Sequence, residues 1–119
     1  MRENILKNKS FAFALRIVKL YQFLGEHKRE FVLSKQTLRS GTAIGALIRE
    51  AEQAESKADF IHKLSIALKE ANETDYWIEL LRQSDYLDKI AFDSLKTDIT
   101  ELLKLLTSII KTSKENGKK

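Results

Sequence analysis

The feature that most constrains this chain is the absence of proline from all 119 residues. Proline breaks helices because its ring removes a backbone donor and clashes with the preceding turn. Glycine, which weakens helices, occurs only at positions 25, 41, 45 and 117. Much of the remaining sequence consists of the good helix formers Lys, Glu, Ala, Leu and Gln. This composition favours a few long, uninterrupted helices.

Apolar residues recur at helical spacing in four segments that are joined by short polar connections. The segments are residues 10–26, 33–54, 58–83 and 90–111. Because short connections between long helices favour antiparallel neighbours, the pattern predicts an all-α, antiparallel up-and-down four-helix bundle. We expect one domain over residues 1–112, followed by a disordered basic tail at residues 113–119.

The first segment has more apolar surface than a single core requires. Its apolar side chains sweep an arc of about 220°, whereas an ordinary surface helix has a stripe little wider than about 100°. They are Phe11, Phe13, Ala14, Leu15, Ile17, Val18, Leu20, Tyr21 and Leu24. Two interpretations remain open: the excess faces a neighbouring subunit, or the helix is buried within its own bundle. Ser10 is the expected N-cap, and Gly25 the expected left-handed residue at the C-terminal end.

The second segment contains a row of small residues, Thr37, Gly41 and Gly45, at a spacing of four. Each glycine inside a helix costs about 1 kcal/mol relative to alanine. We expect a compensating close approach of another part of the backbone to this face of the helix.

Motifs for catalysis are absent. The sequence has no phosphate-binding glycine loop, no nucleophile elbow and no His-Glu-x-x-His motif. It has no cysteine, which excludes disulfides and thiolate metal ligands. His27 and His62 each lack a second histidine at helical spacing. We therefore expect no enzyme activity, no catalytic residue, no cofactor, no metal site and no small-molecule substrate.

Apolar runs are also too short for a membrane span, which needs roughly 20 residues. The first ten residues are polar and lack the apolar core of a signal peptide. We expect a cytoplasmic protein with no membrane partner.

Three glutamates could be mistaken for a metal site. Glu70 and Glu73 precede Trp77 on the third segment, and Glu50 lies on the second. Carboxylates on facing helices can hold two metal ions, but such sites usually pair a glutamate with a histidine one turn away, and none is present here. We expect these glutamates to form ion pairs with basic residues instead. The candidate partners are Arg39, Arg49, Lys69 or another basic neighbour.

Charge is unevenly distributed along the chain. Residues 1–40 carry nine Lys/Arg against three Asp/Glu, residues 41–93 carry six against eleven, and residues 94–119 carry six against three. Clustered basic side chains can neutralise phosphates, with an affinity that depends on salt. The candidate nucleic-acid-binding residues are Arg16, Lys19, Lys28, Arg29, Lys35 and Arg39.

The second and third segments carry a specific resemblance. The stretch LSKQTLRSGTAIGALIREAEQAESKADFIHKLSIALKEANETDYWIELL resembles the bacterial four-helix-bundle proteins encoded in intervening sequences of 23S rRNA genes. The resemblance covers about residues 1–112. Its family-motif and structural positions include Gly45, Glu50, Asp59, Phe60, Glu70, Glu73 and Trp77. Leu47 is a departure, because the family usually has Asn there.

The resemblance implies a four-helix bundle that often assembles into a pentameric ring. The family that the chain resembles has a related branch, the accessory protein of diversity-generating retroelements. That protein is a basic pentamer that binds nucleic acid and a reverse transcriptase. No activity is established for the intervening-sequence proteins themselves.

Three hypotheses follow from the sequence. The first is a non-enzymatic, homo-oligomeric scaffold that binds RNA or another nucleic acid through its basic face. The alternative is a protein–protein interaction module with no nucleic-acid role, in which basic and acidic surfaces pair between subunits. The third, a metal-dependent enzyme using the three glutamates, requires bound transition metal.

Overall fold

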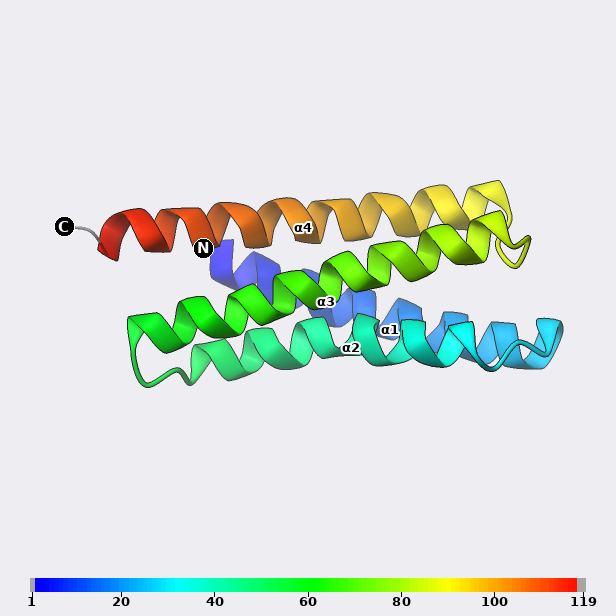
Figure 1. Cartoon of the computed structure of the whole chain (residues 1–119), viewed down its shortest axis with the longest axis horizontal. Coiled ribbons are helices and arrows are strands. Elements are labelled where there is room, and N and C mark those ends of the chain that lie inside the picture. The colour runs from blue at the N-terminus through cyan, green and yellow to red at the C-terminus, as the bar shows by residue number, and fades with distance from the viewer. Residues whose placement is uncertain (1, 118–119) are drawn as a thin grey trace.

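Four long helices run antiparallel to one another within residues 2–117, which are the residues that the computed structural model describes (Figure 1). They are α1 (Arg2–Lys28), α2 (Leu33–Glu52), α3 (Lys57–Gln83) and α4 (Lys89–Gly117). The bundle is elongated, with principal extents of 52 × 22 × 20 Å. The predicted all-α, up-and-down four-helix bundle is confirmed.

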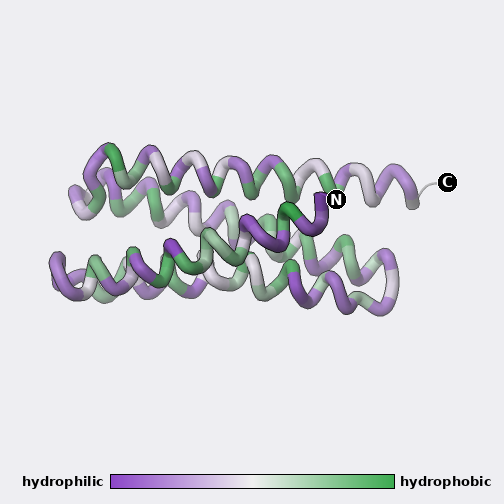
Figure 2. The backbone as a smooth tube through the Cα atoms, turned by 180° about the vertical axis from the view of Figure 1, so that it is seen from behind, coloured by the Kyte–Doolittle hydropathy of each residue, from purple (hydrophilic) through white to green (hydrophobic). Residues whose placement is uncertain are grey.

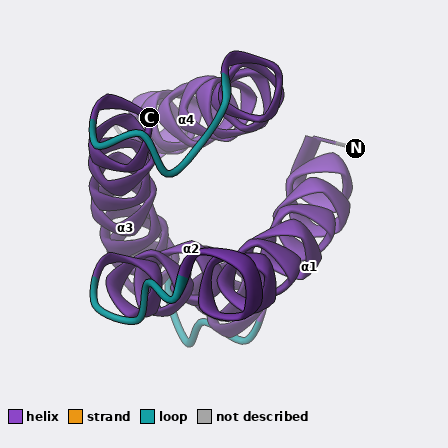
Figure 3. Ribbon diagram, turned by 90° about the vertical axis from the view of Figure 1, so that its right-hand side faces the viewer, coloured by secondary structure: helices purple, strands orange, loops and turns teal. Residues whose placement is uncertain are grey.

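The helices follow one another around the bundle in chain order (Figure 3). Contacts are extensive between consecutive helices and sparser between α1 and α4, which are also neighbours. Long polar side chains bridge this last seam. The bridges are Arg2 to Ser108 (2.5 Å), Lys9 to Glu101 (2.6 Å) and Arg16 to Asp98 (2.6 Å).

The core is a single apolar cluster to which all four helices contribute. In α1 its buried side chains are Leu6, Phe13, Ile17, Leu20 and Leu24, which recur at three-, four- and seven-residue spacing. Hydrophobic segments alternate with hydrophilic ones along every helix, as expected for helices that bury only one side (Figure 2).

The first helix begins earlier and ends later than its sequence suggests. It starts at Arg2, because Leu6 continues the buried stripe and is only 1% exposed. Ser10 is therefore not an N-cap: it is buried inside α1 and its hydroxyl donates to the carbonyl of Lys7 (3.0 Å). Gly25 is helical, and the left-handed residue after α1 is instead Arg29, with φ of 53°.

The side-chain carboxylate of Glu30 caps the N-terminal end of α2, which the sequence did not predict. Glu30 is 8% exposed and accepts hydrogen bonds from the backbone N–H groups of Val32 (3.1 Å), Leu33 (3.0 Å) and Ser34 (2.7 Å). These are N–H groups that an uncapped helix start leaves without partners. Burial raises the pKa of Glu30, but the backbone hydrogen bonds outweigh burial and hold the pKa below its ordinary value.

The last helix runs to Gly117, through most of the segment that we expected to be a disordered tail. Residues 113–117 belong to α4, so that part of the expectation is corrected; Lys118 and Lys119 lie outside the described residues. The segment is rich in good helix formers, and the preceding turn is tied to α1 because Arg2 donates to Thr112 (3.1 Å).

The glycines of α2 lie where α1 crosses close to it, as their spacing predicts. A Cβ added to Gly41 would lie 2.9 Å from the side chain of Ile17. A Cβ added to Gly45 would lie 3.5 Å from the backbone carbonyl of Ser10, an ordinary contact. The same face therefore tolerates a methyl group at one glycine and excludes it at the other.

Candidate functional site

An apolar face lies on the outside of α1, on the side toward α2. Its residues are Phe11, Leu15 and Val18, which are 50%, 51% and 37% exposed. They sit one turn apart on a helix, so they form a continuous stripe. The opposite side of the same helix faces the core. The interpretation that α1 buries its whole apolar arc within its own bundle is therefore wrong for this stripe.

A shallow groove of about 240 Å³ separates the apolar face from α2. Its lining includes Phe11 and Ala14 from α1, with Gly45, Ala46 and Arg49 from α2. The guanidinium carbon of Arg49 lies 5.0 Å from the centroid of the Phe11 ring, within range of a cation–π interaction. The small residues keep the groove open, and the guanidinium forms one polar edge of an otherwise apolar surface.

The glutamates are paired with basic residues, as expected. Arg39 of α2 bonds to Glu73 of α3 and lies 3.6 Å from Glu70, and the indole N–H of Trp77 donates to Glu73 (3.1 Å). One carboxylate oxygen of Glu70, Oε2, is buried without a hydrogen bond within residues 2–117. The ion pair with Arg39 is the compensation that a buried carboxylate oxygen needs.

The remaining motif positions are also structural. Lys63 lies 3.4 Å from Glu50 and joins α3 to α2. Ser56 caps α3, because its hydroxyl accepts from the Asp59 backbone N–H (3.0 Å), and the Asp59 carboxylate in turn accepts from the Glu55 backbone N–H (3.4 Å). Phe60 and Leu47 pack partly buried against the core. Within the described residues no group of three or more His, Asp or Glu is placed to hold a metal ion.

The six candidate nucleic-acid-binding residues divide into two groups. Arg16 and Arg39 are taken up by ion pairs with Asp98 and with Glu70 and Glu73. The other four are exposed and make no ion pair with any residue in the range 2–117; they are Lys19, Lys28, Arg29 and Lys35. The last three surround the α1–α2 connection, and we refer to Lys28, Arg29 and Lys35 as the basic end.

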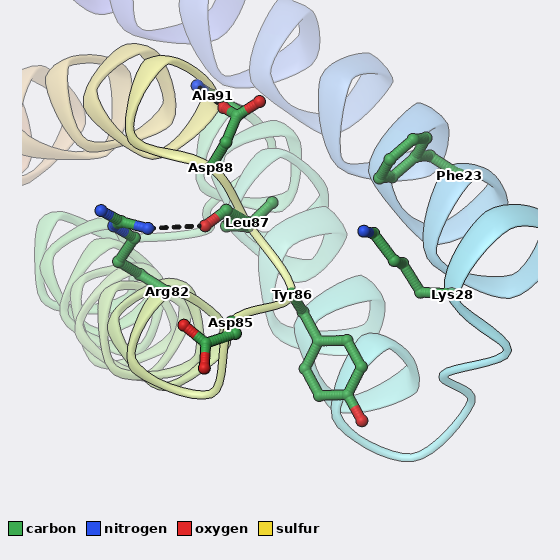
Figure 4. A pocket seen from close by; sticks show the side chains of 8 residues that line it. All are labelled: Phe23, Lys28, Arg82, Asp85, Tyr86, Leu87, Asp88 and Ala91. Carbon is green, nitrogen blue, oxygen red and sulfur yellow. Dashed lines mark hydrogen bonds between the residues drawn. The ribbon is translucent and has the colours of Figure 1, made fainter.

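A pocket of about 260 Å³ opens beside the basic end, between α1 and the α3–α4 connection (Figure 4). Its lining residues are Phe23, Lys28, Arg82, Asp85, Tyr86, Leu87, Asp88 and Ala91. The Arg82 guanidinium donates to the Leu87 carbonyl (3.1 Å), as the dashed line in Figure 4 shows. Of these residues the sequence singled out only Lys28. Six of the others lie within residues 82–91, and nothing in the sequence pattern indicates that this stretch meets Phe23 and Lys28 of α1.

Comparisons with known proteins agree with the resemblance seen in the sequence. A family model described as 23S rRNA-intervening sequence protein matches residues 2–108. A crystal structure of a protein of unknown function from the S23 ribosomal protein family of Bacteroides thetaiotaomicron is 61% identical, with a TM-score of 0.92. The match covers 93% of this chain and 99% of that one. No curated protein matches the chain. None of the helices in the described part of the chain has an apolar stretch sufficient to span a bilayer.

Proposed function

The chain belongs to the 23S rRNA-intervening sequence protein family, and we propose that it is a non-enzymatic scaffold that self-associates and binds RNA. The observation that carries the proposal is the exposed apolar face of α1, formed by Phe11, Leu15 and Val18. Scattered single apolar residues are normal on a surface, but a contiguous patch usually marks an interface. A second copy of the chain is the partner we assign to this face.

The uneven charge of the chain supports self-association between unlike surfaces. The first 40 residues are strongly basic, and residues 41–93 are acidic. Different patches that meet head to tail form a heterologous contact, which closes into a ring when the rotation permits. The family resemblance favours a pentameric ring, and a ring of this kind would bury the apolar face of every subunit.

RNA binding is supported by the basic end. Lys28, Arg29 and Lys35 are exposed, and no ion pair within residues 2–117 neutralises them. Each lysine or arginine that neutralises a phosphate releases condensed counterions, so the affinity falls as salt rises. A ring would repeat the basic end once per subunit and so increase the affinity for a long RNA through multivalency.

Light scattering coupled to size exclusion tests the assembly. We expect the wild type to be oligomeric at micromolar concentration and Leu15→Glu to be monomeric, because the substitution places a charge in the middle of the apolar face. Ile90→Glu is the matched control, since Ile90 is 83% exposed and lies on α4, away from the apolar face. A wild type that stays monomeric at micromolar concentration rules out the assembly.

Fluorescence anisotropy with a labelled single-stranded RNA tests the RNA role at about 50 and 200 mM salt. The double variant Arg29→Ala/Lys35→Ala should bind more weakly and should reduce the slope of log affinity against log salt by about 1.4. The control Lys104→Ala/Lys111→Ala removes the same charge from exposed positions on α4. Absence of binding at the lower salt, or binding indifferent to salt, excludes the RNA role.

The alternative is a protein-interaction module with no nucleic-acid role. The apolar face supports it independently, because self-association through α1 needs no RNA. An oligomeric wild type that binds no RNA in the anisotropy experiment would favour this alternative over the RNA scaffold.

A further inference from the structure

We infer that the pocket between α1 and the α3–α4 connection takes one unpaired base of a single-stranded RNA, with a preference for bases that carry an exocyclic amino group. The inference rests on the proposed RNA-binding role and assigns the site and the kind of RNA. It is argued from the aromatic, basic and acidic side chains that meet in this pocket.

The aromatic side of the pocket is a stacking surface. Phe23 lines the pocket and is 43% exposed, so part of its ring is accessible to a ligand. The ring of His27 lies 5.0 Å from it and holds it from one side. Tyr86 lines the same pocket and also packs against the core. Base stacking on such rings is the common mode by which proteins hold single-stranded nucleic acid.

The basic side of the pocket suits the phosphates on either side of a bound base. Lys28 belongs to the basic end and also lines the pocket (Figure 4). Arg82 has one guanidinium nitrogen bonded to the Leu87 carbonyl, which fixes the orientation of the group and leaves its other N–H donors for a ligand. The positive charges thus flank the stacking surface, as in grooves that follow a single strand.

The acidic residues of the pocket distinguish it from a simple phosphate site. Asp88 uses Oδ1 to accept from the Ala91 backbone N–H (2.8 Å) at the start of α4, which leaves Oδ2 for a ligand. Asp85 has a left-handed backbone, with φ of 68°, that turns the chain after α3. Carboxylates accept hydrogen bonds from the amino group of cytosine. Adenine and guanine also carry an amino group, whereas uracil offers only its ring N3–H, so the two aspartates predict weaker binding of uracil.

A second, larger groove indicates the path of the strand. It has a volume of about 510 Å³, shares Phe23 and Asp88 with the pocket, and continues between α1 and α4. Arg16 and Lys19 line it, and Lys19 is the fourth of the candidate nucleic-acid-binding residues that make no ion pair within residues 2–117. A strand leaving the pocket along this groove would keep its phosphates near α1.

Anisotropy with labelled oligocytidine tests the stacking surface in the full chain. Phe23→Ala should weaken binding about fivefold or more, whereas Phe23→Tyr should retain it. Tyr76→Ala is the matched control, because Tyr76 is 58% exposed and lies on α3 outside the pocket. Circular dichroism and the oligomeric mass of each variant verify that fold and assembly are unchanged. A duplex RNA has no unpaired base to offer, so Phe23→Ala should leave its binding unaltered.

The ratio of affinities for oligocytidine and oligouridine tests the aspartates. The double variant Asp85→Asn/Asp88→Asn removes two negative charges, which raises affinity for both oligomers, so the ratio is the informative quantity. Asn tolerates the left-handed backbone and preserves the helix cap. We expect a wild-type preference for oligocytidine that falls toward one in the variant.

The outcomes separate this inference from the proposed function. Salt-dependent binding that Arg29→Ala/Lys35→Ala weakens, but that Phe23→Ala does not, overturns the base pocket and leaves the RNA role standing. Equal affinity of the wild type for the two oligomers overturns the base preference. If the wild type binds no RNA at all, the RNA role fails, and the base pocket fails with it.

Discussion

Replacing Glu30 by alanine tests how the second helix begins. The change removes a carboxylate that accepts from three backbone N–H groups at 2.7–3.1 Å, and one of these belongs to Ser34, which is only 1% exposed. Loss of an N-cap costs up to about 2 kcal/mol, and a buried donor left without a partner costs about 1–3 kcal/mol. These contributions overlap, so we expect the free energy of unfolding to fall by about 2–3 kcal/mol.

This loss corresponds to a clear change in melting temperature. At about 2.1 cal/mol/K per residue, a chain of 119 residues has an unfolding entropy of about 250 cal/mol/K. The melting temperature of Glu30→Ala should therefore fall by about 8–12 °C, measured by circular dichroism at pH 7 and constant protein concentration. Glu26→Ala is the control, because Glu26 is exposed and should change stability by no more than about 0.5 kcal/mol. A drop of less than about 2 °C in Glu30→Ala would refute the capping argument.

The pH dependence gives an independent check. The pKa of Glu30 is lower in the folded chain than its ordinary value of 4.5. Its stabilisation is therefore fully present above pH 4.5 and is lost as pH falls through the folded pKa. Glu30→Gln cannot ionise, so the stability gap between wild type and this variant should narrow as the solution is acidified below pH 4.5. If the stability difference between wild type and Glu30→Gln stays constant below pH 4.5, the charge of Glu30 does not stabilise the fold.

Other substitutions test packing at the helix faces. Gly41→Ala should destabilise the fold by about 1–3 kcal/mol, because the new methyl group would lie 2.9 Å from Ile17. Gly45→Ala should be neutral or stabilising by up to about 1 kcal/mol, since its methyl group fits and alanine favours the helix; equal effects in denaturant titrations of both variants would contradict this. Trp77→Ala should cost about 1–2 kcal/mol rather than the 3–5 kcal/mol typical of a buried tryptophan, because the side chain is only half-buried and is held by its bond to Glu73. A thermal melt of Trp77→Ala that shows either no loss or a loss above about 3 kcal/mol would show that the ring is placed differently.

The number and order of helices were predictable because apolar periodicity reports directly on burial. Helix ends were less predictable, because they depend on individual packing contacts and on hydrogen bonds between side chains and backbone groups, which apolar periodicity does not report. The first helix was expected to begin at Ser10, although Leu6 precedes Phe13 by seven residues and continues the same stripe. The intervening charged and polar residues concealed that continuity. Glu30 was missed for a related reason, since a glutamate in a charged connection has no sequence signal for capping the helix that follows.

The basic surface was only partly predictable, because a sequence does not state which charges meet. Arg16 and Arg39 looked equivalent to Lys28 and Arg29 in the sequence, yet the first two are neutralised within the bundle. The ion pair of Arg16 joins residues 82 positions apart, and that of Arg39 joins residues 34 positions apart. Separations of this size are set by the bundle topology and by helix rotation. Three of the four candidates left unpaired within the described residues, Lys28, Arg29 and Lys35, gather at one end of the bundle because the α1–α2 connection lies there.

The two sides of α1 show why its outer stripe argues for a partner. A monomeric helix normally places charged residues toward water and apolar residues toward its neighbours. In α1, Lys9 and Arg16 reach across the seam to α4 with side chains that stay 46% and 38% exposed, and Phe11, Leu15 and Val18 face outward as well. Surface ion pairs contribute little to stability, so charge on the seam does not compensate for apolar side chains left in water. Self-association would bury those side chains while leaving the α1–α4 ion pairs intact, and this is the strongest physical reason to expect it.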